Sequence, residues 1–126
     1  MLKTVGTKLG AIEAADGKAV PADFSLLTTA SVLFDAVYIP GGPESVAELL
    51  ANADAYHFLD EAYKHCKAIC ATGEAADFVS TTFAGKADRD SAVIIAAKPA
   101  DAAADFIAAI ANHRNWEREL NRMVPA

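Results

Sequence analysis

The sequence predicts an α/β fold of three layers, with a mostly parallel sheet that carries helices on both faces. Two observations lead to this prediction. The stretches AVYI (36–39) and KAICA (67–71) are almost entirely apolar, which is typical of strands covered on both faces. Between and after them lie longer segments whose apolar residues recur at helical spacing. Short strands that alternate with amphipathic helices form parallel sheets, because a crossover helix joins each strand to the next.

The composition is that of a single globular domain covering residues 1–126. Hydrophobic residues make up 53% of the chain and charged residues 22%, which suits a folded core. The net charge of -6 argues against nucleic acid, whose binding requires a basic face. No apolar stretch approaches the length of a membrane span, and no apolar leader marks the chain for secretion. We therefore expect a cytoplasmic protein without nucleic-acid or membrane partners, in which Cys66 and Cys70 are reduced thiols.

The sequence of residues 2–33 predicts short strands near the start of the chain. Residues 2–7 (LKTVGT) predict the first of them. Asp16-Gly17 lies between two short runs and indicates a β-hairpin, because Gly accepts the positive φ angle of a tight turn. The segment 24–33 is compatible with either a helix or a loop.

The rest of the chain alternates between strands and helices. Gly41-Gly42 ends the strand 36–39, and Pro43 suits the first turn of a helix. The further elements predicted are a helix at 53–65, a strand at 67–71, a helix at 74–79, a strand at 91–97 and an alanine-rich helix over 100–123. In the last helix we expect four large apolar side chains to face inward: Phe106, Ile107, Ile110 and Trp116.

The loops at the carboxyl ends of the strands are the candidate sites, because doubly wound sheets bind ligands there. Gly41 and Gly42 follow the strand 36–39. Glycines let backbone N–H groups approach a ligand closely, as an oxyanion hole requires. The alternative is that the two glycines only turn a strand into a helix, and the pair alone does not decide between these interpretations.

Cys70 is the candidate nucleophile, expected at the junction between a strand and the helix that begins at Glu74. A sharp turn there would expose the sulfur near backbone N–H groups, including that of Ala71, and the positive end of the helix would lower the thiol pKa. Catalysis also needs a base or an acid, yet Ala71 rather than His follows the cysteine. The Glu74 carboxylate would raise the thiol pKa. A buried, inert cysteine is an alternative of at least equal weight.

Other polar residues predict structure rather than chemistry. His57 and His65 lie eight residues apart, too far to chelate one metal ion as an i, i+4 pair can, so we expect no metal site. His113 is expected to pack or to cap a helix. Three arginines repeat every four residues and predict a solvated face with local ion pairs on the last helix: Arg114, Arg118 and Arg122.

Two segments together resemble the PfpI-type protease superfamily, whose fold is flavodoxin-like. They are FDAVYIPGGPESVAELL (34–50) and AYKHCKAICATGEAADF (62–78). The resemblance implies that Cys70 matches the elbow cysteine, which is the nucleophile of active members. It also implies that Gly41-Gly42 matches the loop that supplies oxyanion contacts.

A closer resemblance covers nearly the whole chain. The segments ADGKAVP, DAVYIPGG, DAYHFLDEAYKHCKAI and HRNWERE, followed by a terminal VPA, are similar in that order to the C-terminal domain of large-subunit haem catalases. This resemblance implies a flavodoxin-like domain, of the class I glutamine amidotransferase-like superfamily, appended to a haem-containing core. The haem belongs to that core, so we expect no cofactor and no peroxide turnover in this chain. The implied roles are oligomer stability and chaperone-like protection, and the implied partners are a catalase core, further copies of the chain and unfolded client proteins.

The chain departs from the superfamily pattern in one respect. Residue 1 falls near the family's second strand, so the first strand and helix, with the acidic residue that reaches the elbow cysteine, are expected to be missing. Unpaired sheet edges and apolar surface would then favour self-association. Two further hypotheses stay open at Cys70: a cysteine-dependent hydrolase or glyoxal-processing enzyme, and a redox sensor with Cys66 as the resolving thiol.

Overall fold

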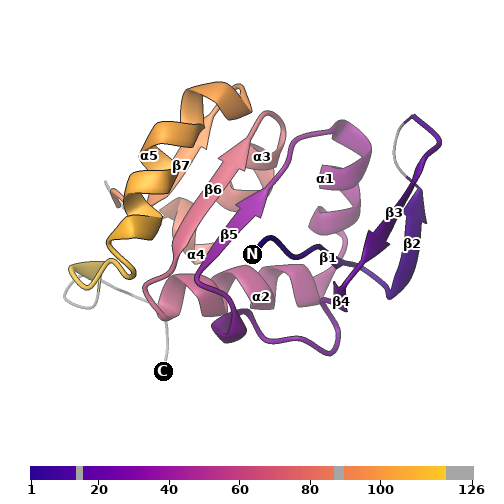
Figure 1. Ribbon diagram of the computed structural model, residues 1–126, viewed down its shortest axis with the longest axis horizontal. Coiled ribbons are helices and arrows are strands. Elements are labelled where there is room, and N and C mark those ends of the chain that lie inside the picture. The colour runs from indigo at the N-terminus through magenta and orange to yellow at the C-terminus, as the bar shows by residue number, and fades with distance from the viewer. Residues whose placement is uncertain (14–15, 87–89, 119–126) are drawn as a thin grey trace. The chain divides into compact units, whose positions relative to one another are not determined.

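The computed structural model describes residues 1–13, 16–86 and 90–118 (Figure 1). These residues form an α/β structure, as the alternation of strands and helices predicted. The chain divides into two compact units, Met1–Ala30 and Ser31–Ala126. The expectation of a single domain over the whole chain stays a prediction.

The first unit is built from short strands. Strands β2 (Gly10–Glu13) and β3 (Ala19–Ala22) pair antiparallel, while β1 (Val5–Gly6) and β4 (Phe24–Ser25) form a small parallel pair. The predicted hairpin is confirmed: Gly17 has a φ of 82°, and the Lys18 N–H donates to the Asp16 carboxylate at 3.0 Å. The strand predicted over 2–7 is correct in place but shorter than expected.

The second unit contains a three-stranded parallel sheet. Its strands are β5 (Ala36–Ile39), β6 (Ala68–Thr72) and β7 (Val93–Ala96), in the order β5-β6-β7. Cys70 pairs with Tyr38 on one side and with Ile94 on the other. All five residues of β6 are buried, as predicted for a central strand that is covered on both faces.

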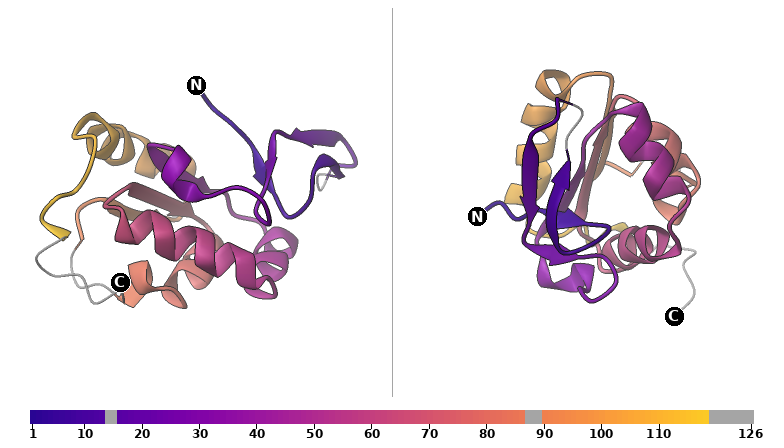
Figure 2. Two further views of the ribbon diagram at one scale, coloured as in Figure 1. Left: turned by 90° about the horizontal axis from the view of Figure 1, so that it is seen from below. Right: turned by 90° about the vertical axis from the view of Figure 1, so that its right-hand side faces the viewer.

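Helices cover both faces of this sheet, which confirms the three predicted layers (Figure 2). Helix α5 (Pro99–Ala111) packs on one face against β6 and β7. Four helices lie on the opposite side, and a short 3₁₀ helix (Ser31–Leu33) precedes β5. These four are α1 (Pro43–Leu50), α2 (Ala53–Lys64), α3 (Ala75–Ser80) and α4 (Phe83–Lys86).

Local chemistry fixes both ends of α2. At its start the Asn52 side chain accepts hydrogen bonds from two backbone N–H groups of the first turn. At its end Cys66 adopts a left-handed φ of 62°, where Gly is the usual residue. The Cys66 N–H donates to the Tyr63 carbonyl and the Lys67 N–H to the Ala62 carbonyl, both at 3.0 Å, which is the Schellman arrangement. Cys66 is therefore part of a helix cap.

The helix predicted over 100–123 is too long. Helix α5 ends at Ala111, and His113 follows in the left-handed conformation with a φ of 65°. The stripe that faces the sheet is Ala102, Phe106 and Ala109. Three of the four side chains expected to face inward are instead exposed: Ile107, Ile110 and Trp116.

Candidate functional site

The loops at the carboxyl ends of β5 and β6 are in direct contact. Gly41 follows β5, and a Cβ atom added to it would lie 2.9 Å from the Thr72 carbonyl oxygen and 2.9 Å from a Glu74 carboxylate oxygen. Gly73 follows β6, and its N–H donates to the Ala96 carbonyl of β7 at 2.9 Å. Gly41 is therefore required for close packing between two loops, which is the structural alternative considered for the glycine pair.

The Gly42 N–H, which was expected to donate to an oxyanion, already donates to a carboxylate of the protein itself. The Gly42 N–H donates to Glu74 Oε2 at 2.8 Å. The backbone N–H of Glu74 and that of Gly42 together lower the pKa of the Glu74 carboxyl below its usual value. The carboxylate is thus ionised at neutral pH and bound to the loop. An incoming oxyanion would have to displace it.

Ala71 lies inside the sheet rather than beside a cleft. It pairs with Ile39 of β5 and Ile95 of β7, and its side chain is buried. Backbone groups of a central strand are used by the neighbouring strands. The expected oxyanion role of Gly41, Gly42 and Ala71 stays a prediction, which this arrangement does not favour.

Cys70 lies in the middle of β6, which corrects its expected position at the strand-to-helix junction. The strand continues to Thr72, and the residue that makes the turn is Gly73, with a left-handed φ of 57°. Cys70 is 1% exposed and packs in an apolar cluster with Ile94 and Ala102. Burial raises the pKa of the Cys70 thiol above its ordinary value, the opposite of activation.

The nucleophilic role of Cys70 stays a prediction, and so does the redox pair with Cys66. Both thiols are buried, and the two are not joined by a disulfide bond. Cys66 is held in the cap of α2, whereas Cys70 is held in the sheet. Every hypothesis that uses Cys70 chemically requires access to its sulfur, and the folded structure restricts that access.

A buried ion pair at the amino ends of β6 and β7 was not predicted. Arg118 is 3% exposed, and its Nε donates to Asp90 Oδ2 at 2.5 Å. Its Nη1 donates to the carbonyls of Tyr63 and Lys67, each at 2.9 Å, and its guanidinium lies 4.4 Å from the centre of the Tyr63 ring. Asn115 Nδ2 donates to Asp90 Oδ1 at 2.8 Å. This cluster joins the segment after α5 to the turn before β7.

The charges in this cluster compensate each other. Burial alone raises the pKa of Asp90, but hydrogen bonds from Arg118 and the charge of that guanidinium outweigh burial, so the pKa lies below its usual value. The predicted solvated arginine stripe is wrong for Arg118. Arg114 stacks over Trp116 at 5.9 Å and donates to the His65 carbonyl at 3.4 Å. Arg122 lies outside the described residues.

Lys67 is a second buried cation that sequence patterns did not reveal. Its Nζ donates to the Val32 carbonyl at 3.1 Å. Burial is the main cause that lowers its pKa, Arg114 lowers it further, and Asp35 acts in the opposite direction. A lysine next to an apolar strand normally extends its amine to solvent, so nothing in the local sequence marks this residue as buried.

Among the described residues no group of three or more His, Cys, Asp or Glu side chains is placed to hold a metal ion. The Nε2 atom of His65 lies 3.3 Å from Glu61 Oε2. His113 is exposed just beyond α5.

None of the helices in the described part of the chain is both long enough and apolar enough to span a membrane.

Comparison with known proteins gives a family and a fold. The family model of the C-terminal domain found in long catalases matches residues 2–119. Catalase-1 of Neurospora crassa is 35% identical over 93% of this chain, and Catalase HPII of Mycobacterium avium is 38% identical, also over 93%. The chain spans only 19% and 18% of the lengths of these two relatives.

The fold of this chain is also similar to that of proteins whose structures have been solved. A DJ-1 superfamily protein from Salmonella typhimurium, solved as a C103A mutant, superposes with a TM-score of 0.57 at 24% sequence identity. The match covers 76% of this chain and 58% of that one. It supports the predicted flavodoxin-like fold.

Proposed function

The chain belongs to the family of C-terminal domains found in long catalases, and from this premise we propose that it is a non-catalytic accessory domain of a large-subunit catalase. The observation that carries the proposal is that the donor and the thiol expected at the carboxyl end of the sheet are both already engaged within the protein. The Glu74 carboxylate is bound to the Gly42 N–H, and the Cys70 sulfur is buried within β6. Hydrolase, glyoxalase and redox-sensor chemistry would each require access to that sulfur.

In this proposal haem binding and peroxide turnover belong to the rest of a parent catalase. The purified chain is expected to bind no haem after incubation with haemin, measured by Soret absorbance, and to release no oxygen from hydrogen peroxide. Stoichiometric haem binding or measurable turnover would overturn the non-catalytic role. We place the domain in the cytoplasm with the catalase that carries it.

Contact with a catalase core or with further copies of the chain is the proposed means of stabilising an oligomer. In the described part of the chain α5 is the helix that covers one face of the sheet, and Tyr38, Ile107 and Ile110 are exposed there. In addition β5 is an edge strand of its sheet in the described part of the chain. Exposed apolar side chains beside a strand edge favour association.

Light scattering of size-exclusion fractions tests this contact. The double variant Ile107→Ser/Ile110→Ser is expected to lower the average mass if the α5 face mediates association. Leu50→Ser is the matched control, because Leu50 and Ile110 are both 39% exposed but Leu50 lies on α1, on the other side of the sheet. Equal loss of association in the two variants would remove the α5 face from the proposal.

Chaperone-like protection of other proteins is the finer part of the proposal. The same exposed apolar residues of α5 are the candidate contacts for partly unfolded clients. Heat-induced aggregation of a client enzyme, followed by light scattering, is expected to fall when the chain is added and to fall less with Ile107→Ser/Ile110→Ser. If several-fold excess of the chain leaves the aggregation unchanged, this role is excluded.

A further inference from the structure

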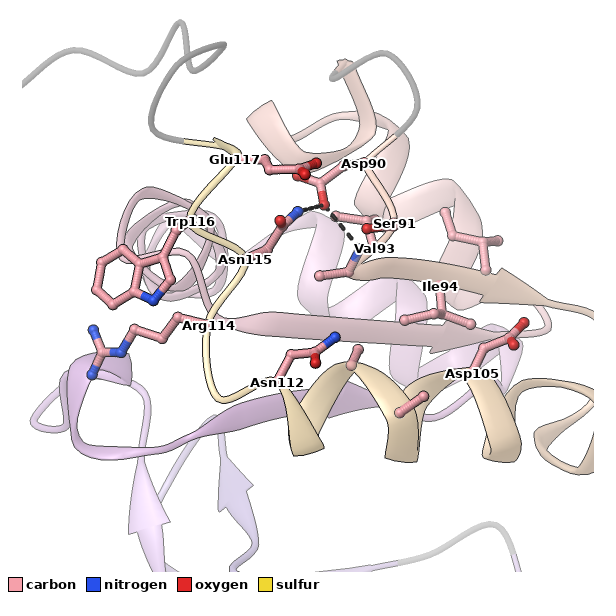
Figure 3. A pocket seen from close by; sticks show the side chains of 14 residues that line it. Asp90, Ser91, Val93, Ile94, Asp105, Asn112, Arg114, Asn115, Trp116 and Glu117 are labelled. Carbon is pink, nitrogen blue, oxygen red and sulfur yellow. Dashed lines mark hydrogen bonds between the residues drawn. The ribbon is translucent and has the colours of Figure 1, made fainter.

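A groove runs along the outer edge of β7, away from the loops at the carboxyl ends of the strands (Figure 3). Its volume is about 900 Å³. The edge of β7 forms one side, Asp105 of α5 and Asn112 just beyond its end form another, and Trp116 lies at one end. The groove is separate from Cys70 and from the Gly42–Glu74 contact.

The backbone of β7 offers unused hydrogen-bonding groups to this groove. The Ala92 and Ala96 carbonyls accept from Ile69 and Gly73 on the β6 side. Because backbone groups alternate along a strand, those of Ile95 point away from β6. The Ile95 side chain is 48% exposed, and in the described part of the chain no strand pairs with this edge of β7. An edge of this kind accepts an added strand.

The charges along the groove determine which kind of peptide strand could pair with β7. Three carboxylates line it, of which Asp90 is already neutralised by Arg118. Asp105 and Glu117 have no ion-pair partner among the described residues. Arg114, the cation that lines the groove, stacks over Trp116, at the end opposite Asp105 (Figure 3). The groove near Asp105 is therefore acidic.

We propose that this groove binds an extended peptide segment that carries basic residues and adds to β7 as a fourth strand. Backbone hydrogen bonds to Ile95 supply the pairing, and a Lys or Arg side chain of the peptide lies against the Asp105 carboxylate. The partner is thus a strand-forming basic segment of another protein, a role that goes beyond the accessory function proposed above.

Fluorescence anisotropy with two labelled peptides tests the charge preference. The probes are Val-Lys-Val-Lys-Val and Val-Glu-Val-Glu-Val, both acetylated and amidated, titrated with the full chain. The basic peptide is expected to bind and the acidic one is not. Asp105→Asn, which keeps the shape of the side chain, is expected to weaken binding of the basic peptide about tenfold, as loss of a charge-assisted contact does. Equal binding of both peptides would overturn the proposal.

A pair of substitutions at Ile95 tests the strand pairing. Ile95→Pro removes the outward N–H, and an edge strand tolerates Pro because that group is not used by the sheet. Ile95→Thr keeps the N–H and serves as the control. Binding of the basic peptide is expected to disappear in the Pro variant and to persist in the Thr variant, with circular dichroism confirming that both are folded. Unchanged binding in both Ile95→Pro and Asp105→Asn would overturn the proposal. Loss of self-association in Ile95→Pro would assign the groove to a second copy instead.

Discussion

The polar groups at the two ends of the parallel sheet lie in different surroundings. At the carboxyl ends of β5 and β6, the Glu74 carboxylate is exposed and accepts a hydrogen bond from the Gly42 N–H. At the amino ends of β6 and β7, Arg118 and Asp90 form an ion pair whose side chains are 1% and 6% exposed. The first end carries the residues that seemed reactive in the sequence. The second carries charges whose removal from water makes them important for stability.

This difference shows that residues which look like a catalytic site in the sequence need not have reactive surroundings in the structure. At the carboxyl end the Gly42 N–H donor is already bound to Glu74, and the residue that makes the turn after β6 is Gly73. The amino end holds the buried Arg118–Asp90 pair, and the Arg118 guanidinium donates to Asp90 and to the carbonyls of Tyr63 and Lys67. Among the described residues neither end presents an activated group to a substrate, and this observation supports the accessory role proposed above.

The largest expected effect is at the buried end. Asp90→Ala leaves the Arg118 guanidinium without its counter-ion, and we expect a loss of about 3–5 kcal/mol of unfolding free energy, the usual cost of breaking a buried pair. Urea denaturation followed by circular dichroism measures this loss. The double variant Asp90→Ala/Arg118→Met is the control, because it removes both charges and should be more stable than Asp90→Ala alone. A loss below about 1 kcal/mol in Asp90→Ala would show that the pair behaves like a surface contact.

The pH dependence of stability gives the next effect. The pKa of Asp90 is lower in the folded chain than its ordinary value of 3.8, so the ionised carboxylate favours folding. This stabilisation is fully present above the unfolded pKa and is lost as the pH falls through the folded pKa. Asp90→Asn lacks it, since an amide does not ionise.

The stability advantage of the native chain over Asp90→Asn should therefore shrink as the pH is lowered from 7 to 3. The full change, reached once the pH is below the folded pKa, is about 1.4 kcal/mol for each unit by which the pKa is lowered, and the range down to pH 3 captures part of it. Urea denaturation of both proteins across this range measures it. A difference that is independent of pH would contradict the assigned protonation state of Asp90.

The smallest effect is expected at the exposed end. Glu74→Gln keeps an oxygen that can accept the Gly42 N–H, and the group is surrounded by solvent, so the urea midpoint should not change measurably. Glu74→Gln should also leave the chain without hydrolase or glyoxalase activity. A large loss of unfolding free energy in Glu74→Gln would mean that the Glu74–Gly42 contact stabilises the fold as the buried Arg118–Asp90 pair does. A gain of hydrolase or glyoxalase activity would mean that Glu74 blocks a working site.

The hydrophobic pattern was sufficient to predict the elements of the second unit. Strands β5, β6 and β7 and helices α1 to α3 lie within a few residues of their predicted positions, because apolar spacing directly reflects burial. The family resemblance was equally dependable, since it rests on segments spread along the chain.

Positions that depend on tertiary contacts were not predictable in the same way. Cys70 was placed at a turn because the sequence does not reveal that the strand continues to Thr72. The spacing of the arginines predicted a continuous helix, but α5 ends at Ala111 and Arg118 pairs with Asp90, 28 residues earlier in the chain. Such a partner leaves no local pattern.

In this interpretation the chain carries no activated cysteine, and the alkylation rate of Cys70 provides the decisive experiment. The folded chain is treated with iodoacetamide between pH 5 and 10, and peptide mass mapping distinguishes Cys70 from Cys66. We expect slow modification of Cys70 with no titration below the ordinary thiol pKa of about 8.5, because burial raises its pKa. Fast modification of Cys70 that titrates below about pH 7 would show that this thiol is activated.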